Sequence, residues 1–200
     1  MANLKWESLK NNKNMIEKNA TFGAILENCI QILATEQDFA VSINQFLKYV
    51  GEYYNANRVY ILEFDWKSNV ADNTYEWCAE GVEKEIDNLK GVPLEYISSW
   101  VDRLKCDGEI CSSDSVGDCL MAVPLYSGST MIGLIEADGL RKHAKELCLM
   151  RVCSYLVTEQ LGKKRDELLT VPILQELNRK DFCDIIITFL REERNTDEST

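Results

Sequence analysis

The sequence predicts an α+β fold in which helices cover a central antiparallel sheet. Three observations predict it. Apolar residues recur at helical spacing near both ends of the chain, and two middle segments are rich in β-branched and aromatic residues. The turn Ser127-Gly128-Ser129 also joins two apolar runs, as in a β-hairpin. The expected order of elements is helix, helix, strand, strand, helix, hairpin, helix.

Two amphipathic helices are expected first. The spacing of six apolar residues predicts a helix whose buried stripe is Phe22, Ile25, Leu26, Cys29, Ile30 and Leu33. Thr35 and Asp38 are typical of an N-cap followed by an acid in the first turn, so a second helix is expected over 36–54.

Two strands should follow these helices. Residues 58–64 are rich in β-branched and aromatic residues on both alternating sets, which is typical of a central strand covered on both faces. Residues 73–79 should be the antiparallel partner, with Tyr75 and Trp77 on one face and Glu76 on the other.

The second half of the chain should add a helix, a hairpin and a long helix. Pro93 suits the first turn of a helix that runs to Leu104, and a short strand is expected near Ile110. The hairpin should pair 120–126 with 130–137, and the long helix should run from Leu147 to Leu169. We expect an N-terminal extension over 1–20 and a domain over 21–170. An amphipathic helix at 182–190 and a disordered tail should make up 171–200.

The charge and composition exclude several kinds of partner and site. A formal net charge of -11 repels phosphate backbones and anionic lipid, so neither nucleic acid nor a membrane is expected as a partner. No signal-peptide core and no run of roughly 18 apolar residues is present, which predicts a cytoplasmic protein. The eight cysteines show no C-x₂-C spacing, and His143 is the single histidine. We therefore expect reduced thiols, no metal and no cofactor.

Five segments resemble a known family. The segments 58–64, 73–82, 86–93, 122–125 and 132–138 are similar in order and rough spacing to those of GAF domains, especially GAF domains of bacterial diguanylate cyclases and histidine kinases. The resemblance covers about 36–165. It implies a GAF/PAS-like sheet with the N- and C-terminal helices packed on one face and a small-molecule pocket on the other.

The resemblance does not extend to the ligands of particular GAF groups. No cysteine neighbours a histidine as at bilin attachment sites, and the Asn-Lys-Phe-Asp-Glu set of cyclic-nucleotide-binding relatives is missing. The connection 111–119 is also shorter than is usual in the family. His143 should be an exposed residue in the first turn of the last long helix.

One enzymatic relative is similar in part. GAF-fold free methionine-sulfoxide reductases use loop cysteines and carboxylates, for which Cys106, Cys111, Glu136 and Asp138 are candidates here, with Cys106 and Cys111 together in a loop-like stretch. Leu120 stands where that family has an acid, and the cysteines do not fall at its motif positions. No catalytic residue is therefore predicted.

The sequence favours a binding domain over an enzyme. We expect a non-catalytic regulatory or sensor domain of bacterial signal transduction that binds a small cytosolic ligand or a protein partner, such as an output-domain protein. A ligand-free dimerisation or docking module and a reductase are the alternatives. Glu76 and Asp138 are further pocket candidates. Core packing is the alternative role for the aromatic candidates, and solvent exposure or ion pairing for the acidic ones. The expected ligand-binding residues are Trp77, Trp100, Tyr96, Tyr75 and Glu136.

A homodimer is expected through the first amphipathic helix and the last long helix. On the last helix, apolar residues span more than the one side that can face the sheet, and an apolar surface of this width often has a second partner. The alternative is a monomer in which the segment 182–190 folds back and covers this apolar surface.

Overall fold

The computed structural model describes residues 22–113 and 119–167. The chain divides into two units, 1–162 and 163–200, and the fold described below belongs to the first. The expected extension over 1–20 and the expected helix at 182–190 lie outside the described residues.

Six strands form one antiparallel sheet in the order β3-β2-β1-β6-β5-β4. The strands are β1 (Arg58–Asp65), β2 (Val70–Cys78), β3 (Val92–Pro93), β4 (Ile110–Ser113), β5 (Cys119–Ser127) and β6 (Thr130–Leu140). The helices are 22–35, α2 (Phe39–Tyr54), the 3₁₀ turn η1 (Leu94–Ile97), α3 (Ser98–Asp107) and α4 (Cys148–Glu167). The predicted α+β fold and its antiparallel sheet are confirmed.

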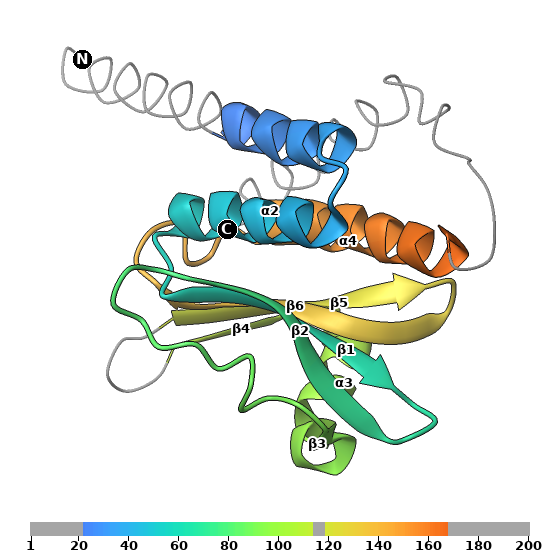
Figure 1. The fold of residues 1–200 in the computed structure, drawn as a ribbon. Helices are drawn as coiled ribbons and strands as arrows, with labels where there is room; N and C mark the ends of the chain where they lie inside the picture. The colour runs from blue at the N-terminus through green and yellow to red at the C-terminus, as the bar shows by residue number, and fades with distance from the viewer. Residues whose placement is uncertain (1–21, 114–118, 168–200) are drawn as a thin grey trace, which may run out of the picture. The chain divides into compact units, whose positions relative to one another are not determined.

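The two faces of the sheet carry separate cores. Helices α2 and α4 cover one face, helix 22–35 lies on the outside of this pair, and α3 covers the opposite face (Figure 1). We call the first core the helix-side core; it includes Cys29, Phe46, Ile61, Ile135 and Val157. The second, the α3-side core, includes Tyr60, Leu62, Leu104, Ile110 and Leu134. Strand β1 contributes to both because its alternate residues face opposite sides.

Helix α2 begins and ends at polar caps. The Asp38 side chain accepts a hydrogen bond from the backbone N–H of Val41 at 3.0 Å, so Asp38 is the N-cap and not a first-turn residue as predicted. Thr35 instead belongs to helix 22–35, where its hydroxyl donates to the Gln31 carbonyl. Asn55 ends α2 in the left-handed conformation, with φ 48.

Gly51 lets α2 lie directly on the sheet. A Cβ atom at this position would overlap the indole of Trp77 on β2, so no larger residue fits without displacement of the ring. Trp77 is half-buried against the helix-side core. The glycine is therefore explained by close approach of helix and strand.

A β-bulge changes the faces of strand β2. Ile61 of β1 pairs with Tyr75, but its neighbour Leu62 pairs with Asn73, so Thr74 is the extra residue. Before the bulge Asn73 faces the α3 side, and after it Glu76 does. Without the extra residue the strict alternation of a strand would place these two side chains on opposite faces.

Three sequence predictions differ from the structure. Pro93 lies in the edge strand β3 and not in a helix, which suits its missing N–H, and α3 begins only at Ser98. Cys111 lies in strand β4 and Cys106 in α3, so the two do not share a loop. His143 precedes α4, with φ 55, and stacks on Tyr53 at 4.3 Å between ring centroids. It is half-buried because of this stacking.

Gly51→Ala should lower the free energy of unfolding by about 1–3 kcal/mol, because the new methyl group overpacks the contact with Trp77. Urea denaturation measures the change. The matched control is Gly162→Ala in α4, where an added Cβ meets no described atom within 4 Å and should be neutral or stabilising by up to about 1 kcal/mol. Equal effects at both positions would contradict the proposed packing.

Candidate functional site

Polar side chains occupy neighbouring positions on the α3 side of three adjacent strands. Tyr60 of β1 pairs with Glu76 of β2 on one side and with Glu136 of β6 on the other. Arg58 lies two residues before Tyr60 on β1 and pairs with Asp138 of β6. We call Arg58, Tyr60, Glu76, Glu136 and Asp138 the polar cluster. It borders the apolar residues of the α3-side core.

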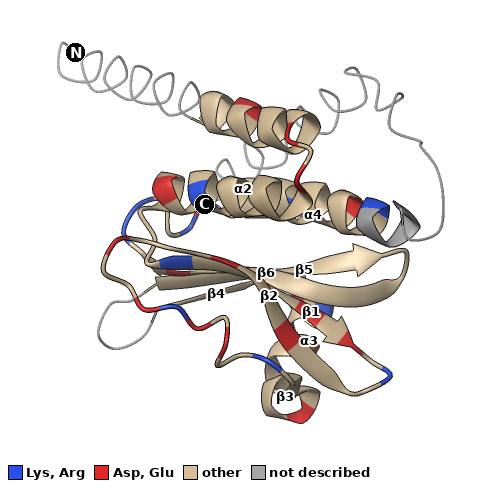
Figure 2. Cartoon of the chain, in the orientation of Figure 1, with Lys and Arg blue, Asp and Glu red and all other residues tan. Residues whose placement is uncertain are grey.

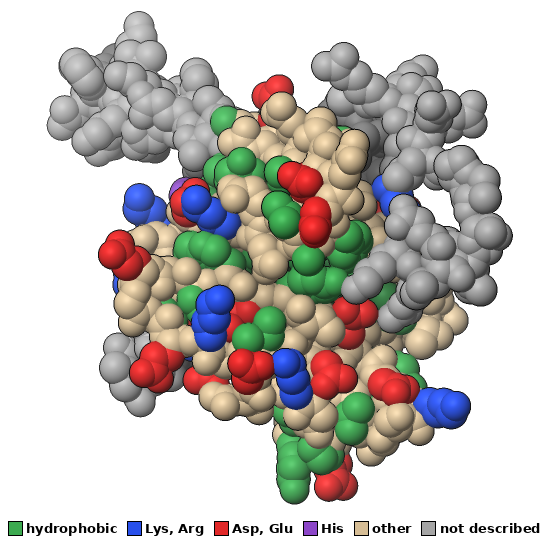
Figure 3. Space-filling model, in the orientation of Figure 1, with side chains coloured by type: hydrophobic (Ala, Val, Ile, Leu, Met, Phe, Trp, Pro, Cys, Tyr) green, Lys and Arg blue, Asp and Glu red, His purple; other side chains and the backbone are tan. Residues whose placement is uncertain are grey.

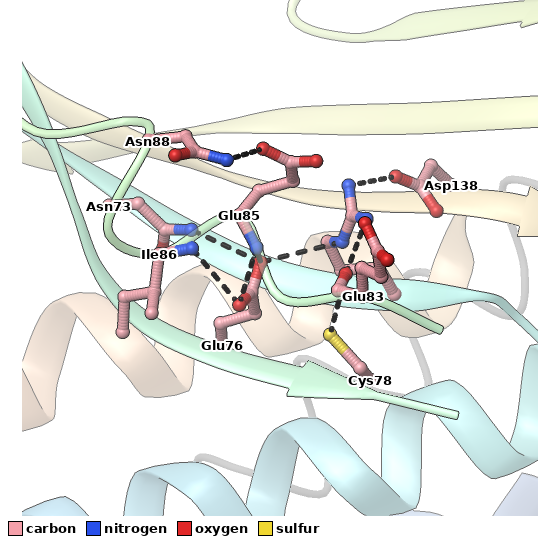
Figure 4. A network of polar contacts seen from close by, with 9 residues as sticks. Asn73, Glu76, Cys78, Glu83, Glu85, Ile86, Asn88 and Asp138 are labelled. Carbon is pink, nitrogen blue, oxygen red and sulfur yellow. Dashed lines mark hydrogen bonds and ion pairs between the residues drawn. The ribbon is translucent and has the colours of Figure 1, made fainter. Parts of the chain in front are cut away.

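Glu76 anchors the loop that follows β2. Its side chain is fully buried, and its carboxylate accepts hydrogen bonds from the backbone N–H groups of Glu85, at 3.0 and 3.1 Å, and Ile86, at 3.1 Å (Figure 4). The Asn73 amide donates to the same carboxylate at 3.4 Å. These hydrogen bonds tie the loop after β2 to the strand, so Glu76 has a structural role.

Arg58 links this anchor to strand β6. Its Nε lies 3.4 Å from Glu76 Oε1, in a geometry that makes an ion pair but no hydrogen bond. Its Nη1 lies 3.4 Å from Asp138 Oδ2, and its Nη2 donates to the Glu83 carbonyl at 2.9 Å. Burial lowers the pKa of Arg58, but the hydrogen bond with Cys78 and the charge of Asp138 more than offset this and raise it. The guanidinium is thus a fixed positive charge.

Glu136 is the titratable group of the cluster. It is 4% exposed and shares a side-chain hydrogen bond with Tyr60. Burial raises the pKa of Glu136 to about 7, and the negative charge of Asp138 adds to this, whereas the Tyr60 hydrogen bond and Arg58 oppose it. Burial likewise raises the pKa of Tyr60, which stays a hydroxyl donor. Glu136 can therefore gain or lose a proton near neutral pH.

Cys78 is the cysteine of the described chain next to these groups. Its thiol lies 3.8 Å from the Glu83 carbonyl. Burial raises the pKa of Cys78, and the charge of Glu76 adds to this, although the Arg58 hydrogen bond opposes it. The group is a thiol and not a thiolate at neutral pH, which makes it a poor nucleophile.

The chain is similar to known proteins at the level of structure. No family model matches the chain, and no curated protein matches it. Solved structures do match. A GAF domain of a Coxiella burnetii phosphoenolpyruvate-protein phosphotransferase matches with a TM-score of 0.58 at 9% identity, over 74% of this chain and 96% of that chain. The chain has a GAF-like fold.

Two other GAF-like structures are similar over comparable lengths. The phycoerythrobilin-bound GAF domain of a cyanobacterial phytochrome matches with a TM-score of 0.54 at 14% identity, over 72% of this chain and 96% of that chain. The free methionine-R-sulfoxide reductase of Neisseria meningitidis, solved with its substrate, matches with a TM-score of 0.53 at 15% identity, over 72% and 89%. At these identities the similarity concerns the fold.

The sheet of the GAF-like fold separates the five predicted ligand residues. Tyr75 lies on the helix side and meets Phe39 edge-on at 5.8 Å, and Trp77 lies on the same side against Gly51. Trp100 and Glu136 belong to the α3 side. Tyr96 in η1 is 76% exposed. The five residues therefore do not form one site, because Tyr75 and Trp77 face the opposite side of the sheet from Glu136.

The structure adds three residues that sequence reasoning missed: Arg58, Tyr60 and Asn73. Arg58 and Tyr60 alternate with apolar Val59 and Ile61, which could have indicated a polar stripe on one face of β1. Asn73 gave no such signal, since its face depends on the bulge.

The two cysteines of the reductase alternative lie on different elements, Cys106 exposed in α3 and Cys111 in β4. Cys111 pairs with Met121, a residue of the helix-side core, and its thiol donates to the Ala144 carbonyl at 3.4 Å. It therefore faces away from Glu136. The described residues contain no group of three or more potential ligands that could hold a metal ion. Among them, no helix has the length and apolarity to cross a membrane.

Glu136→Gln should change how stability depends on pH. The folded wild type keeps a proton on Glu136 up to about pH 7, whereas the unfolded chain releases it near pH 4.5. Raising the pH through this window therefore favours unfolding of the wild type, by up to about 3 kcal/mol, and the loss persists above it. The variant should lack this loss.

Urea denaturation of both proteins from pH 4 to 8 measures the difference. The control is Glu80→Gln at an exposed position, which should follow the wild-type profile. Parallel wild-type and Glu136→Gln profiles would show that Glu136 does not titrate in this window.

Proposed function

We propose that the chain is a non-catalytic regulatory domain that binds a small polar molecule at the polar cluster, on the α3 side of the sheet. The observation that carries the proposal is the Tyr60–Glu136 pair, which lies buried on the central strands beside an apolar core. A carboxyl group with a pKa near 7 in such a place is common at functional sites.

Stability alone gives no reason for this pair. Burying a carboxyl group costs free energy, and well-packed apolar residues of similar volume are often at least as stabilising as a buried polar pair. Glu76 and Arg58 hold the loop 79–91, but Glu136 makes no hydrogen bond to that loop in the described structure. A ligand that contacts Tyr60 or Glu136 would explain why polar groups occupy these positions.

The available groups indicate the chemistry of the ligand. Tyr60 supplies a hydroxyl and Glu136 a carboxyl that changes charge near neutral pH. Asn73 is 1% exposed, and its Oδ1 atom has no hydrogen-bond partner among the described residues. A buried acceptor of this kind suits a donor group on a ligand. Trp100, on the same side of the sheet, is the predicted aromatic residue that could contact an apolar part of such a molecule.

Ligand binding could be transmitted to the helices because strands β1 and β6 contribute side chains to both cores. Strands β1 and β6 present Tyr60 and Glu136 to the α3 side, and Ile61 and Ile135 to the core under α2 and α4. A ligand that shifts these strands would shift the packing of the helices. Two similar proteins carry small molecules, phycoerythrobilin in the phytochrome GAF domain and the substrate in the reductase, which supports a binding role for this fold.

A reductase role is less well supported. Reduction of a sulfoxide starts from a thiolate beside an acid. The thiol beside the cluster is Cys78, whose raised pKa opposes thiolate formation, and Cys111 lies on the other face. A non-catalytic role therefore stays the proposal.

Homodimerisation through the terminal helices also stays a proposal. Much of the apolar surface of α4 that motivated it is buried within the helix-side core, including Leu149, Val157 and Leu161. Exposed Tyr155 on α4 supports a further contact through this helix. Sedimentation equilibrium of the full chain measures whether it forms a homodimer.

Native mass spectrometry of the freshly purified chain tests the binding function. A small molecule should co-purify with the wild type and with the control Glu80→Gln, and should be lost from Tyr60→Phe and Glu136→Gln. Where nothing co-purifies, a thermal-shift screen against a small-metabolite collection replaces it. The proposal fails if no compound stabilises the chain, or if bound compounds are insensitive to both cluster variants; the first result would favour a ligand-free docking module.

A further inference from the structure

Glu136 has no ion-pair partner in the part of the chain that the structure describes. Arg58 is the one basic residue of the polar cluster, and its three nitrogens are directed elsewhere. They lie at the Glu76 carboxylate, at the Asp138 carboxylate and at the Glu83 carbonyl. The cluster therefore contains three acidic side chains and one basic one, and the buried carboxyl group of Glu136 lacks a cation in contact.

A second acceptor on the same side of the sheet also lacks a partner. Asn73 is 1% exposed, and its Nδ2 donates to Glu76. Its Oδ1 accepts no hydrogen bond from any described residue. Asn73 and Glu136 lie two strands apart, which separates them by about 10 Å across the sheet. A buried acceptor without a donor costs free energy, and native proteins rarely keep one unless another molecule supplies the donor.

We propose that the ligand of the polar cluster is a small organic cation with two N–H donor groups. An ammonium or guanidinium group binds Glu136, the second donor reaches Asn73, and binding releases the proton of Glu136. This ligand class rests on the binding function proposed above. Ammonium and guanidinium groups carry donors and no acceptor, which suits two positions that both lack a donor. A linear diamine or guanidino-amine carries two such groups on one short chain.

The surroundings of Glu136 favour a protonated carboxyl group while no cation is bound. Burial raises the pKa of Glu136 to about 7, and the charge of Asp138 adds to this. Tyr60 and Arg58 oppose the rise. A cation in contact with the carboxylate favours its ionised form, so the proton leaves to the solvent when the ligand binds.

The other elements near Glu136 supply no further buried charge beyond Glu76. Strand β5 places Ala122 opposite Glu136, and the buried residues of α3 are the apolar Val101 and Leu104. The remaining charged or titratable residues of β2 near Arg58 and of α3 are half-buried Cys78 and exposed Asp102, Arg103, Lys105, Cys106 and Asp107. Glu136 is therefore the group of this site whose protonation the ligand changes.

The affinity for the cation should rise with pH. Below about pH 7 each binding event must release a proton, whereas above it the carboxyl group of Glu136 is already ionised. Ammonium and guanidinium groups stay charged throughout this range. Between pH 5.5 and pH 8 the association constant should therefore increase about thirtyfold.

Calorimetric titration of the full chain tests the ligand class. The cationic probes are putrescine, cadaverine, agmatine and spermidine, and glutarate and 1,5-pentanediol are the anionic and neutral counterparts. The buffers contain about 0.15 M salt, which screens attraction to surface charges. At least one cation should bind at pH 8. At pH 6 its binding should release about one proton, measured as the difference in heat between two buffers of different ionisation enthalpy.

A matched pair of variants separates the site from the general attraction of an acidic chain for cations. Glu136→Gln keeps the shape of the side chain and should weaken binding at pH 8 at least about tenfold, because a hydrogen bond to a charged group contributes more than one factor of ten. It should also abolish the proton release. Glu80→Gln removes the same charge at an exposed position and should match the wild type.

The ligand class and the binding function fail in different ways. If none of the four cations binds, the ligand class is wrong, and the binding function then depends on the thermal-shift screen alone. Cations that bind both variants equally, or that release no proton at pH 6, would overturn the site at Glu136. A neutral or anionic compound that requires Tyr60 and Glu136 would overturn the cation and leave the binding function in place.

Discussion

The buried Glu76 carboxylate is the constraint on which the α3 side of the molecule depends. It binds two backbone N–H groups of the loop 79–91 and holds Arg58 by charge. Arg58 in turn reaches Asp138 on β6 and the Glu83 carbonyl on the loop. The loop itself carries charges of both signs, visible along the segment between β2 and β3 in Figure 2. In the same orientation, Figure 3 shows acidic side chains spread over the face of the molecule turned to the viewer. One buried carboxyl group thus fixes a loop that has little apolar surface of its own.

Strand β2 connects this anchor with the helices. Glu76 faces the loop, while its neighbours Tyr75 and Trp77 face Phe39 and Gly51 of α2. A movement of β2 therefore changes the α3 side and the helix side together. The bulge at Thr74 makes this arrangement possible, because it lets Asn73 and Glu76 share a face although three residues separate them. The titratable Glu136 sits two strands away, across Tyr60.

The sequence predicted the sheet and its helices because their apolar periodicities are long and regular, as in 58–64 and the stripe from Phe22 to Leu33. It could not predict the site to the same degree. Tyr75 and Trp77 look like ligand residues in a one-dimensional pattern, but only tertiary packing shows that α2 covers them. The polar cluster depends on strand register and on a bulge, and neither follows from residue spacing within one strand. The predicted helix start at Pro93 is wrong because the fixed φ of proline also suits an edge strand.

Hydrogen–deuterium exchange of Glu76 variants tests the central claim most directly. In Glu76→Ala the amides of Glu85 and Ile86 lose their acceptor and should exchange more than about tenfold faster, because hydrogen bonds to a charged group are worth roughly 1.5–3 kcal/mol. Glu76→Gln, which keeps one acceptor oxygen, should be intermediate. Glu83→Ala, which alters an exposed side chain of the same loop and leaves its carbonyl in place, should match the wild type. Unchanged exchange at Glu85 and Ile86 in Glu76→Ala, with the sheet still protected, would contradict the role of Glu76 as the anchor.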